Sequence, residues 1–202
     1  MIHAIVLAAG ASRRMGRPKA LLPVGATTFV GHIANTLEAS GLTDVTVVLG
    51  ADAELITPML PPFRGRVVVN EHWATGQLSS LVAALRVIGD ETPSGALVWP
   101  VDRPFVTRVT IAALLEAFRK HTAKIIIPVH GGKRGHPVIF PSKYFGEFQS
   151  ARSGVGARQI LHDHPDSVLE VESGEEGVLL NIDTPEQYKT QMERMSAVLS
   201  FP

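Results

Sequence analysis

The sequence predicts an α/β sandwich in which helices cover both faces of a mostly parallel sheet. Short runs of β-branched and other apolar residues alternate along the chain with segments of helical periodicity. The strand-like runs are almost continuously apolar, as expected for strands that are buried on both faces. A three-layer arrangement accounts for both observations, because each crossover between parallel strands places a helix against the sheet.

The predicted elements follow one another in short steps. Strands are expected at residues 3–8, 44–49, 66–69, 96–100, 124–129 and 138–140. Helices are expected at residues 28–40, 53–59, 78–88, 107–120, 156–162 and 184–199. Clusters of Pro and Gly at 61–62, 92–95 and 131–135 predict loops, and none of them is long enough to link two domains. We therefore expect a single domain over residues 1–202.

The composition excludes several classes of protein. The 202 residues carry 19 basic and 19 acidic side chains, so the formal net charge is zero, which argues against general affinity for nucleic acid or anionic membranes. The absence of Cys excludes disulfides and thiolate metal sites. No apolar run approaches membrane-spanning length, and no basic region precedes the first apolar run as it would in a signal peptide. We expect a cytoplasmic protein whose anion binding is local.

The turn after the first predicted strand concentrates Gly and basic residues. Gly10 and Gly16 let the backbone approach a ligand, and a turn of exposed N–H groups forms a nest for anions. The basic side chains of this turn, which could neutralise a polyphosphate, are Arg13, Arg14, Arg17 and Lys19. Ligands of such sheets bind beyond the carboxyl ends of the strands, where this turn falls. The sequence thus predicts a phosphate site, although Arg13 and Arg17 taken singly are equally well explained as solvated side chains.

The same turn carries a motif of a known superfamily. L-A-A-G-x-x-x-R-M-G-x-x-K, residues 7–19, resembles the signature of nucleotidyltransferases that activate sugars, isoprenoid precursors and molybdopterin. Residues 70–81 (NEHWATGQLSSL), 131–140 (GGKRGHPVIF) and 181–188 (NIDTPEQY) resemble the molybdenum cofactor cytidylyltransferase branch. The resemblance implies a Rossmann-like nucleotidyltransferase fold and Mg²⁺-dependent transfer of CMP from CTP to molybdopterin or the molybdenum cofactor. A molybdoenzyme or its chaperone is a further candidate partner.

The resemblance also implies roles for individual residues. Arg14, Lys19 and Asp102 are the expected catalytic residues, with Arg14 and Lys19 holding the triphosphate. The expected nucleotide-binding residues are Leu7, Ala8, Ala9, Gly10, Ser12, Arg13, Gly16, Gly76, Ser79 and Ser80. The expected acceptor-binding residues are Arg134, Gly135 and His136. Met15 is expected to belong to the core.

Asp102 and Asp183 are the expected Mg²⁺ ligands. Hard carboxylate oxygens suit this ion, which takes only one or two carboxylates from a protein. Alternatives stay open, because Asp102 precedes a predicted helix and could act as a turn or N-cap carboxylate, and Asp183 precedes Pro185 in the same way. Arg103 stands where the family usually has Met or Gln, and its guanidinium could pair with Asp102 or with a substrate phosphate.

Three further residues have two interpretations each. Ser79 could bind the nucleoside or cap the helix that follows it. His136 lies in a Gly-rich loop and could bind the acceptor or only its own loop. Arg158 lies in a segment that resembles the family, but the acid that commonly precedes this segment is missing, so its assignment stays open.

Two other functions remain alternatives. A guanylyl- or other nucleotidyltransferase would activate a different small phosphorylated acceptor, although L-A-A-G resembles the cytidylyl branch more than the L-A-G-G of the guanylyl relatives. A non-catalytic carrier of the molybdenum cofactor would keep the fold alone. The presence of Arg14, Lys19, Asp102 and Asp183 together argues against the carrier, because a carrier needs neither triphosphate-binding nor metal-binding groups.

Overall fold

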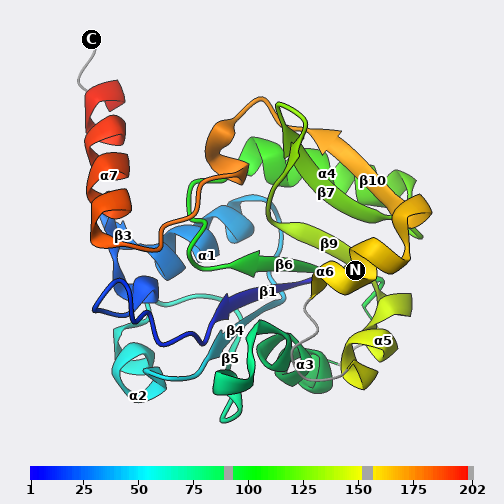
Figure 1. Cartoon of the computed structure of the whole chain (residues 1–202), viewed down its shortest axis with the longest axis horizontal. Helices are drawn as coiled ribbons and strands as arrows, with labels where there is room; N and C mark the ends of the chain where they lie inside the picture. Colours follow the sequence, from blue (N-terminus) through cyan, green and yellow to red (C-terminus); the bar gives the residue numbers. More distant parts are fainter. Residues whose placement is uncertain (89–92, 152–156, 200–202) are drawn as a thin grey trace.

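The computed structural model of the chain describes residues 1–88, 93–151 and 157–199, and it confirms the predicted α/β architecture. An eight-stranded sheet has the order β10-β7-β9-β6-β1-β4-β5, and β8 pairs with β7 beside this path (Figure 1). Its strands are β1 (Ile2–Ala8), β4 (Val45–Leu49), β5 (Arg66–Val69), β6 (Gly95–Pro100), β7 (Ile125–His130), β8 (Lys133–Arg134), β9 (Val138–Pro141) and β10 (Val168–Glu172). A small separate hairpin joins β2 (Pro23–Val24) and β3 (Thr27–Thr28).

Helices cover both faces of the sheet, as predicted. They are α1 (Phe29–Ala39), α2 (Ala53–Ile56), α3 (Gln77–Ile88), α4 (Arg108–Lys120), α5 (Phe145–Ser150), α6 (Ala157–Asp163) and α7 (Pro185–Leu199). Successive side chains of β1 enter two different cores, because side chains alternate between the faces of a strand. Val6 packs in the core that α1 and α4 cover, whereas Ile5 and Leu7 pack in the core that α3 covers. The sheet is therefore the middle of three layers.

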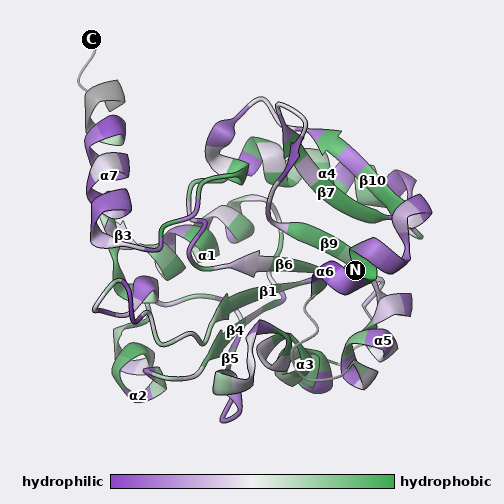
Figure 2. Cartoon of the chain, viewed as in Figure 1, coloured by the Kyte–Doolittle hydropathy of each residue, from purple (hydrophilic) through white to green (hydrophobic). Residues whose placement is uncertain are grey.

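The hydropathy of the chain follows these layers. Figure 2 shows the central strands as mainly hydrophobic and the helices with hydrophilic residues along their lengths. Helix α7 projects from the rest of the chain, with its first turns nearest the other elements (Figure 1). Tyr188 attaches it there, since its ring lies 6.0 Å from that of Phe29 and its hydroxyl donates to the carbonyl of Pro23 at 2.8 Å.

The reversed direction of β9 determines where the later loops lie. Strand β1 is parallel to β4 and β6, and β7 is parallel to β10. Strand β9 is inserted antiparallel between β6 and β7, so that Val138 pairs with Val98 and Pro141 with Gly95. The start of β9 therefore lies at the edge where β6 ends. The loop that precedes β9 consequently shares this edge with the segments that follow β1 and β6.

Some sequence-based expectations need correction. The expected loop at 131–135 contains β8, because Gly131 and Gly132 adopt positive φ values of 54° and 73° and turn the chain back onto β7. The expected helix 53–59 ends as an α-helix at Ile56, and Thr57–Met59 continue as a 3-10 turn, since Pro58 lacks the N–H that an α-helix needs. Residue 156, the start of another expected helix, lies outside the described residues.

Besides β8 and the β2–β3 hairpin, strand β10 and helix α5 were not predicted. Strand β10 contains Glu170 and Glu172 among its apolar residues, and its side chains are half-buried or exposed, as at the edge of a sheet. Helix α5 has six residues and is too short for its periodicity to be recognised. In the described parts of the chain, no helix is both long and apolar enough to span a membrane.

Candidate active site

Ser12 organises the turn that follows β1. Its backbone has a φ of +48°, uncommon for a residue other than Gly, and its carbonyl accepts the N–H groups of Met15 at 2.9 Å and Gly16 at 3.0 Å. Its hydroxyl accepts the N–H of Lys19 at 3.1 Å. Met15 is buried in the core, as predicted. The turn is thus tied at both ends, and the backbone of Lys19 is fixed by it.

The side chain of Lys19 lies between the two predicted metal ligands. Its Nζ is 3.4 Å from Oδ2 of Asp102 and 2.5 Å from Oδ1 of Asp183. The other oxygen of Asp183 accepts from Arg14 at 3.0 Å and from the amide nitrogen of Asn181 at 2.7 Å. Only 13% of the Lys19 side chain is exposed, so this ion pair is largely protected from solvent screening. Two carboxylates that are far apart in the sequence therefore converge on one cation.

The surroundings of Asp183 favour its charged form. Burial alone would raise the pKa of this carboxyl group. The hydrogen bond and the charge of Lys19 oppose that effect, as do the charge of Arg14 and the hydrogen bond from Asn181, and together they hold the pKa below its usual value. Asp183 is consequently an anionic oxygen donor at neutral pH.

The donor set fits a hard divalent cation. The ammonium group of Lys19 is the cation that the two carboxylates of Asp102 and Asp183 hold here, so these oxygens already converge on a single positive charge. Within residues 1–88, 93–151 and 157–199, no group of three or more His, Cys, Asp or Glu side chains could hold a metal ion. Mg²⁺ commonly takes one or two carboxylates and completes its shell with substrate phosphates and water. Asp102 and Asp183 would supply this part of its coordination.

The capping alternatives for these acids are not what the structure shows. Thr107, rather than Asp102, occupies the N-cap position of α4, and the Asp102 carboxylate contacts Lys19 instead. At the start of α7, the hydroxyl of Thr184 accepts the N–H of Gln187 at 3.3 Å. The side chains of Asp102 and Asp183 are therefore not used as helix caps.

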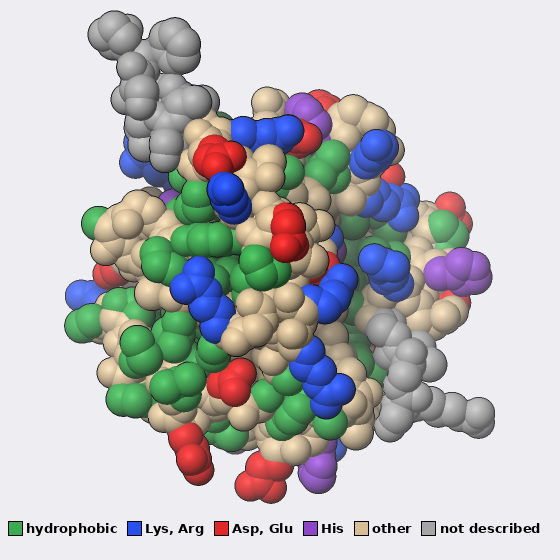
Figure 3. Space-filling model, turned by 60° about the vertical axis from the view of Figure 1, so that its left-hand side comes forward, with side chains coloured by type: hydrophobic (Ala, Val, Ile, Leu, Met, Phe, Trp, Pro, Cys, Tyr) green, Lys and Arg blue, Asp and Glu red, His purple; other side chains and the backbone are tan. Residues whose placement is uncertain are grey.

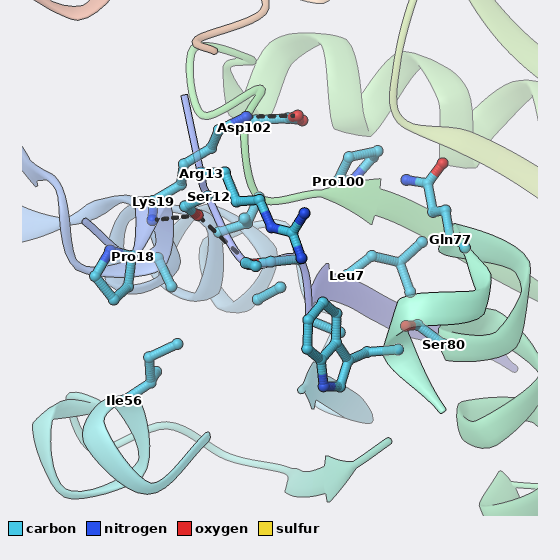
Figure 4. Close-up of a pocket in the computed structure, with 18 of the residues that line it drawn as sticks. Leu7, Ser12, Arg13, Pro18, Lys19, Ile56, Gln77, Ser80, Pro100 and Asp102 are labelled. Carbon is cyan, nitrogen blue, oxygen red and sulfur yellow. Dashed lines mark hydrogen bonds and ion pairs between the residues drawn. The ribbon is translucent and has the colours of Figure 1, made fainter. Parts of the chain in front are cut away.

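A cavity of about 560 Å³, called the turn cavity here, lies beside the Ser12 turn. Predicted residues that line it are Leu7, Ala8, Ala9, Gly10, Ser12, Arg13, Lys19, Gly76, Ser80 and Asp102. Figure 4 shows the side chain of Arg13 extending between Lys19 and Asp102 on one side and Gln77 and Ser80 on the other. The turn cavity thus brings together most of the predicted nucleotide-binding residues.

Four other predicted residues do not line the turn cavity. Arg14 and Asp183 pair with each other beside it, and Gly16 provides a positive φ of 74° in the turn. The hydroxyl of Ser79 donates toward the carbonyls of Gly76 at 2.8 Å and His72 at 3.0 Å, which holds the loop before α3. The turn cavity is also lined by residues that were not predicted to bind the nucleotide, namely Ile56, Trp73, Gln77 and Pro100.

A second cavity of about 730 Å³, the histidine cavity, contains the predicted acceptor residues Arg134, Gly135 and His136. Arg103, Arg158 and Asn181 supply further polar groups. Its apolar lining comes from Leu78, Leu81, Val98, Ile127, Val138, Phe140, Ala157 and Leu161. Leu7, Gln77, Pro100 and Asp102 line both cavities, so the two cavities adjoin at the end of β6.

Close packing of Gly135 positions His136. The N–H of Gly135 donates to the carbonyl of Pro128 at 2.7 Å, and the N–H of His136 donates to the carbonyl of Val178 at 3.0 Å. A Cβ on Gly135 would lie 2.5 Å from that Val178 oxygen, which is a severe clash. Burial, followed by the charges of Arg103 and Arg158, lowers the pKa of His136 to about 4. The imidazole is therefore neutral at physiological pH.

Arg103 holds the segment after residue 177 against the end of β6. Its guanidinium donates to the carbonyls of Leu179 at 3.0 Å and Val178 at 3.5 Å, rather than pairing directly with Asp102. Burial lowers the pKa of Arg103, whereas the nearby charges of Asp102 and Asp183 raise it. Arg103, where the resembling family usually has Met or Gln, thus anchors the segment at Val178 and Leu179. Its positive charge also faces the histidine cavity.

One face of the molecule carries side chains of both charges, in agreement with the neutral composition. Figure 3 shows Lys and Arg side chains scattered over one face, with acidic and apolar side chains among them. Arg134 at the rim of the histidine cavity pairs with Glu170 at 2.7 Å. Positive charge therefore does not form one broad patch on this face.

Comparisons with known proteins find one matching family model and several similar sequences. Residues 4–168 match the family described as the MobA-like NTP transferase domain. Nicotine blue oxidoreductase of Paenarthrobacter nicotinovorans is 34% identical over 92% of this chain and 94% of its own length. Molybdenum cofactor cytidylyltransferase of Escherichia coli K12 is 29% identical over 98% of both chains. A probable molybdenum cofactor guanylyltransferase of Mycobacterium ulcerans is 32% identical over 63% of this chain and 61% of its own.

Solved structures agree in fold over almost the whole chain. The crystal structure of Rv0371c from Mycobacterium tuberculosis H37Rv has a TM-score of 0.84 and 27% identity, and covers 95% of this chain and 97% of that one. Rv0371c was also crystallised in complex with manganese, and this structure gives a TM-score of 0.76 and 26% identity over 95% of this chain and 98% of that one.

Proposed function

This chain belongs to the MobA-like NTP transferase family, and we propose that it transfers CMP from CTP to molybdopterin or the molybdenum cofactor. The nucleotidyltransferase chemistry is the property of its family. The cytidylyl donor, the pterin acceptor and the requirement for Mg²⁺ are the specific parts of the proposal.

The observation that carries the proposal is that the two cavities adjoin at Asp102. The turn cavity provides Lys19, Arg13 and a turn of small residues, which suit a nucleoside triphosphate. The histidine cavity provides Arg134, His136 and an apolar lining, which suit an acceptor with an anionic group. In-line transfer needs the attacking oxygen of the acceptor and the leaving pyrophosphate on opposite sides of the reacting phosphorus. Adjoining cavities with a shared carboxylate meet this need.

The chemistry can be assigned to residues of both cavities. A phosphate oxygen of the acceptor attacks the α-phosphorus of CTP, the bond from this phosphorus to the bridging oxygen breaks, and pyrophosphate leaves. Lys19 and Arg13 bind and neutralise the triphosphate, while the backbone of the Ser12 turn orients it. Mg²⁺, held by Asp102 and Asp183, would neutralise charge on the triphosphate. The manganese complex of the similar protein Rv0371c supports a divalent ion in this fold.

Relatives with other names define the alternatives. The guanylyltransferase relatives favour GTP as an alternative donor. The relative named nicotine blue oxidoreductase favours electron transfer to an acceptor in place of nucleotidyl transfer. The position of Lys19 between two carboxylates argues for phosphate and metal chemistry. Hydride transfer requires neither a phosphate-binding lysine nor a pair of metal-binding carboxylates.

The experiment incubates the protein with CTP, Mg²⁺ and molybdopterin and measures pyrophosphate. Release that requires all three components is the expected result. Parallel reactions contain GTP in place of CTP, or NADH with an oxidised dye and no nucleotide. Pyrophosphate release with GTP but not with CTP would show that GTP is the donor. NADH oxidation without pyrophosphate release would show that the protein is an oxidoreductase.

A further inference from the structure

Two buried polar atoms in the histidine cavity have no hydrogen-bond partner among the described residues. They are Nδ1 of His136 and Oδ1 of Asn181, and both residues line this cavity. A buried polar atom without a partner costs free energy, so native proteins nearly always satisfy such atoms. Their occurrence together in one cavity indicates that a ligand supplies the missing partners.

The orientation of the Asn181 amide is determined by Asp183. Its Nδ2 donates to Oδ2 of Asp183 at 2.7 Å, and the opposite orientation would place an oxygen against a carboxylate. Oδ1 is therefore the atom that remains unpartnered, and it can only accept a hydrogen bond. The ligand must present a donor to Asn181.

The rest of the cavity specifies the remaining chemistry of the ligand. Leu78 and Leu81 from α3 and Val98 and Val138 from the sheet form an apolar lining that suits the faces of a flat ring. Arg158 and Arg134 provide positive charge for an anionic group. His136 carries no charge at neutral pH, so it offers a neutral hydrogen-bonding nitrogen rather than a cation.

From this arrangement we propose that Asn181 determines acceptor specificity by accepting a hydrogen bond from a ring N–H of a planar, anionic heterocycle bound in the histidine cavity. His136 contributes the second hydrogen bond to the same heterocycle. Asn181 also contacts Asp183, so the residue that recognises the acceptor is held by a carboxylate of the predicted metal site. The inference rests on the proposed function only in placing the acceptor in this cavity.

The test compares two fluorescent ligands that differ in their ring N–H groups. Lumazine-6-carboxylate has these donors, whereas 1,3-dimethyllumazine-6-carboxylate has methyl groups in their place and keeps the flat ring and the carboxylate. The wild-type protein should bind the first at least about tenfold more tightly in a fluorescence titration, because the methylated ring leaves Asn181 unpartnered. Equal binding of the two, or binding of neither, would overturn the inference.

Variants assign the discrimination to Asn181. In Asn181→Leu the ratio of the two dissociation constants should fall to within about twofold. Asn35→Leu, at an exposed position of α1 outside both cavities, should keep the wild-type ratio. A merely structural role of Asn181 would weaken both ligands together and preserve the ratio, which would contradict the inference. If Asn181→Leu does not fold by circular dichroism, Asn181→Ser is used in the same comparison.

The outcome is separable from that of the proposed function. Pyrophosphate release with loss of ligand discrimination would refute the role of Asn181 and leave the transferase activity established. Discrimination without pyrophosphate release would refute the transferase activity and leave the heterocycle site established.

Discussion

The ammonium group of Lys19 lies 2.5 Å from Oδ1 of Asp183, although the two residues belong to opposite ends of the sequence. Asp102 approaches the same ammonium group from the end of β6. A cation of the protein itself therefore lies between the two carboxylates that are proposed to hold Mg²⁺. This arrangement has consequences for both metal binding and turnover.

Removal of the Lys19 charge should strengthen metal binding in the absence of nucleotide. In Lys19→Met, Asp102 and Asp183 would no longer share an ammonium group, and the dissociation constant for Mn²⁺ should fall by about tenfold because a nearby positive charge is lost. Electron paramagnetic resonance of free Mn²⁺ measures this constant. Lys133→Met, at an exposed position of β8, is the matched control and should leave it unchanged. Weaker Mn²⁺ binding in Lys19→Met would show that Lys19 does not occupy the metal position.

Asp102→Asn should lower turnover by about a hundredfold, equivalent to about 3 kcal/mol, because the metal loses a charged ligand at the junction of the two cavities. Asp183→Asn should cost less, because Asp102 lines both cavities whereas Asp183 lies beside them. Both constants come from pyrophosphate release at several Mg²⁺ concentrations. A turnover of Asp102→Asn within a few-fold of the wild type at the same Mg²⁺ requirement would exclude Asp102 as a ligand.

CTP should be used with a kcat/KM at least about tenfold above that of GTP, a difference of about 1.4 kcal/mol. Ala9 lines the turn cavity and places a methyl group where the guanylyl relatives have Gly, which narrows the space for a base. Ala9→Gly should therefore reduce the ratio. Steady-state kinetics with both nucleotides measures it, and equal use of the two by the wild type would favour a guanylyltransferase.

His136→Ala should raise the KM for the acceptor and leave the dissociation constant of CTP nearly unchanged. The reason is that His136 lines the histidine cavity but not the turn cavity. Calorimetric titration with CTP and kinetics with varied acceptor separate the two effects. If CTP affinity fell as much as acceptor affinity, His136 would have only a structural role.

The lowered pKa of His136 also predicts how stability depends on pH. The folded protein keeps this imidazole neutral down to a pKa of about 4, whereas the unfolded chain takes up a proton near the ordinary value of 6.5. The unfolded state therefore binds more protons between these values, so stability falls as the pH falls from 6.5 toward 4. From pH 7 to 4.5 the wild type should lose about 2 kcal/mol more than His136→Gln.

Urea denaturation at several pH values measures this difference. The lowered pKa of His32 acts in the same direction but is present in both proteins, so it cancels in the comparison. His121→Gln, at an exposed position, should follow the wild type. Parallel curves for the wild type and His136→Gln would show that the imidazole is not kept neutral by the fold.

The sequence predicted the parts of the site that depend on local patterns. The apolar runs of β1 and β6, and the Gly and basic residues after β1, are recognisable without the fold. The Ser12 turn and Asp102 could therefore be placed at one edge of the sheet. Asn181 and Arg103 could not be assigned, because their roles depend on contacts across the chain. Arg103 anchors Val178 and Leu179, and this contact brings Asn181 beside the histidine cavity.

The direction of β9 was also beyond sequence reasoning. Three or four buried residues such as Val138–Pro141 have the same composition in a parallel and in an antiparallel strand. Their pairing with β6 is a property of the whole sheet. The loop with His136 consequently could be predicted as a binding loop but could not be located beside Asp102.

The two cavities draw most of their polar groups from separate stretches of the chain. The turn cavity is built entirely from residues 7–102, whereas most of the polar groups of the histidine cavity come from residues after 133. Under the proposed function, substitutions at Arg134, His136 or Arg158 would alter what receives the transferred group and leave the lining of the turn cavity unchanged. Proteins of this fold could then evolve new acceptors and keep the same lining of the turn cavity. Recombination near the end of β6 would exchange most polar groups of the histidine cavity in one event.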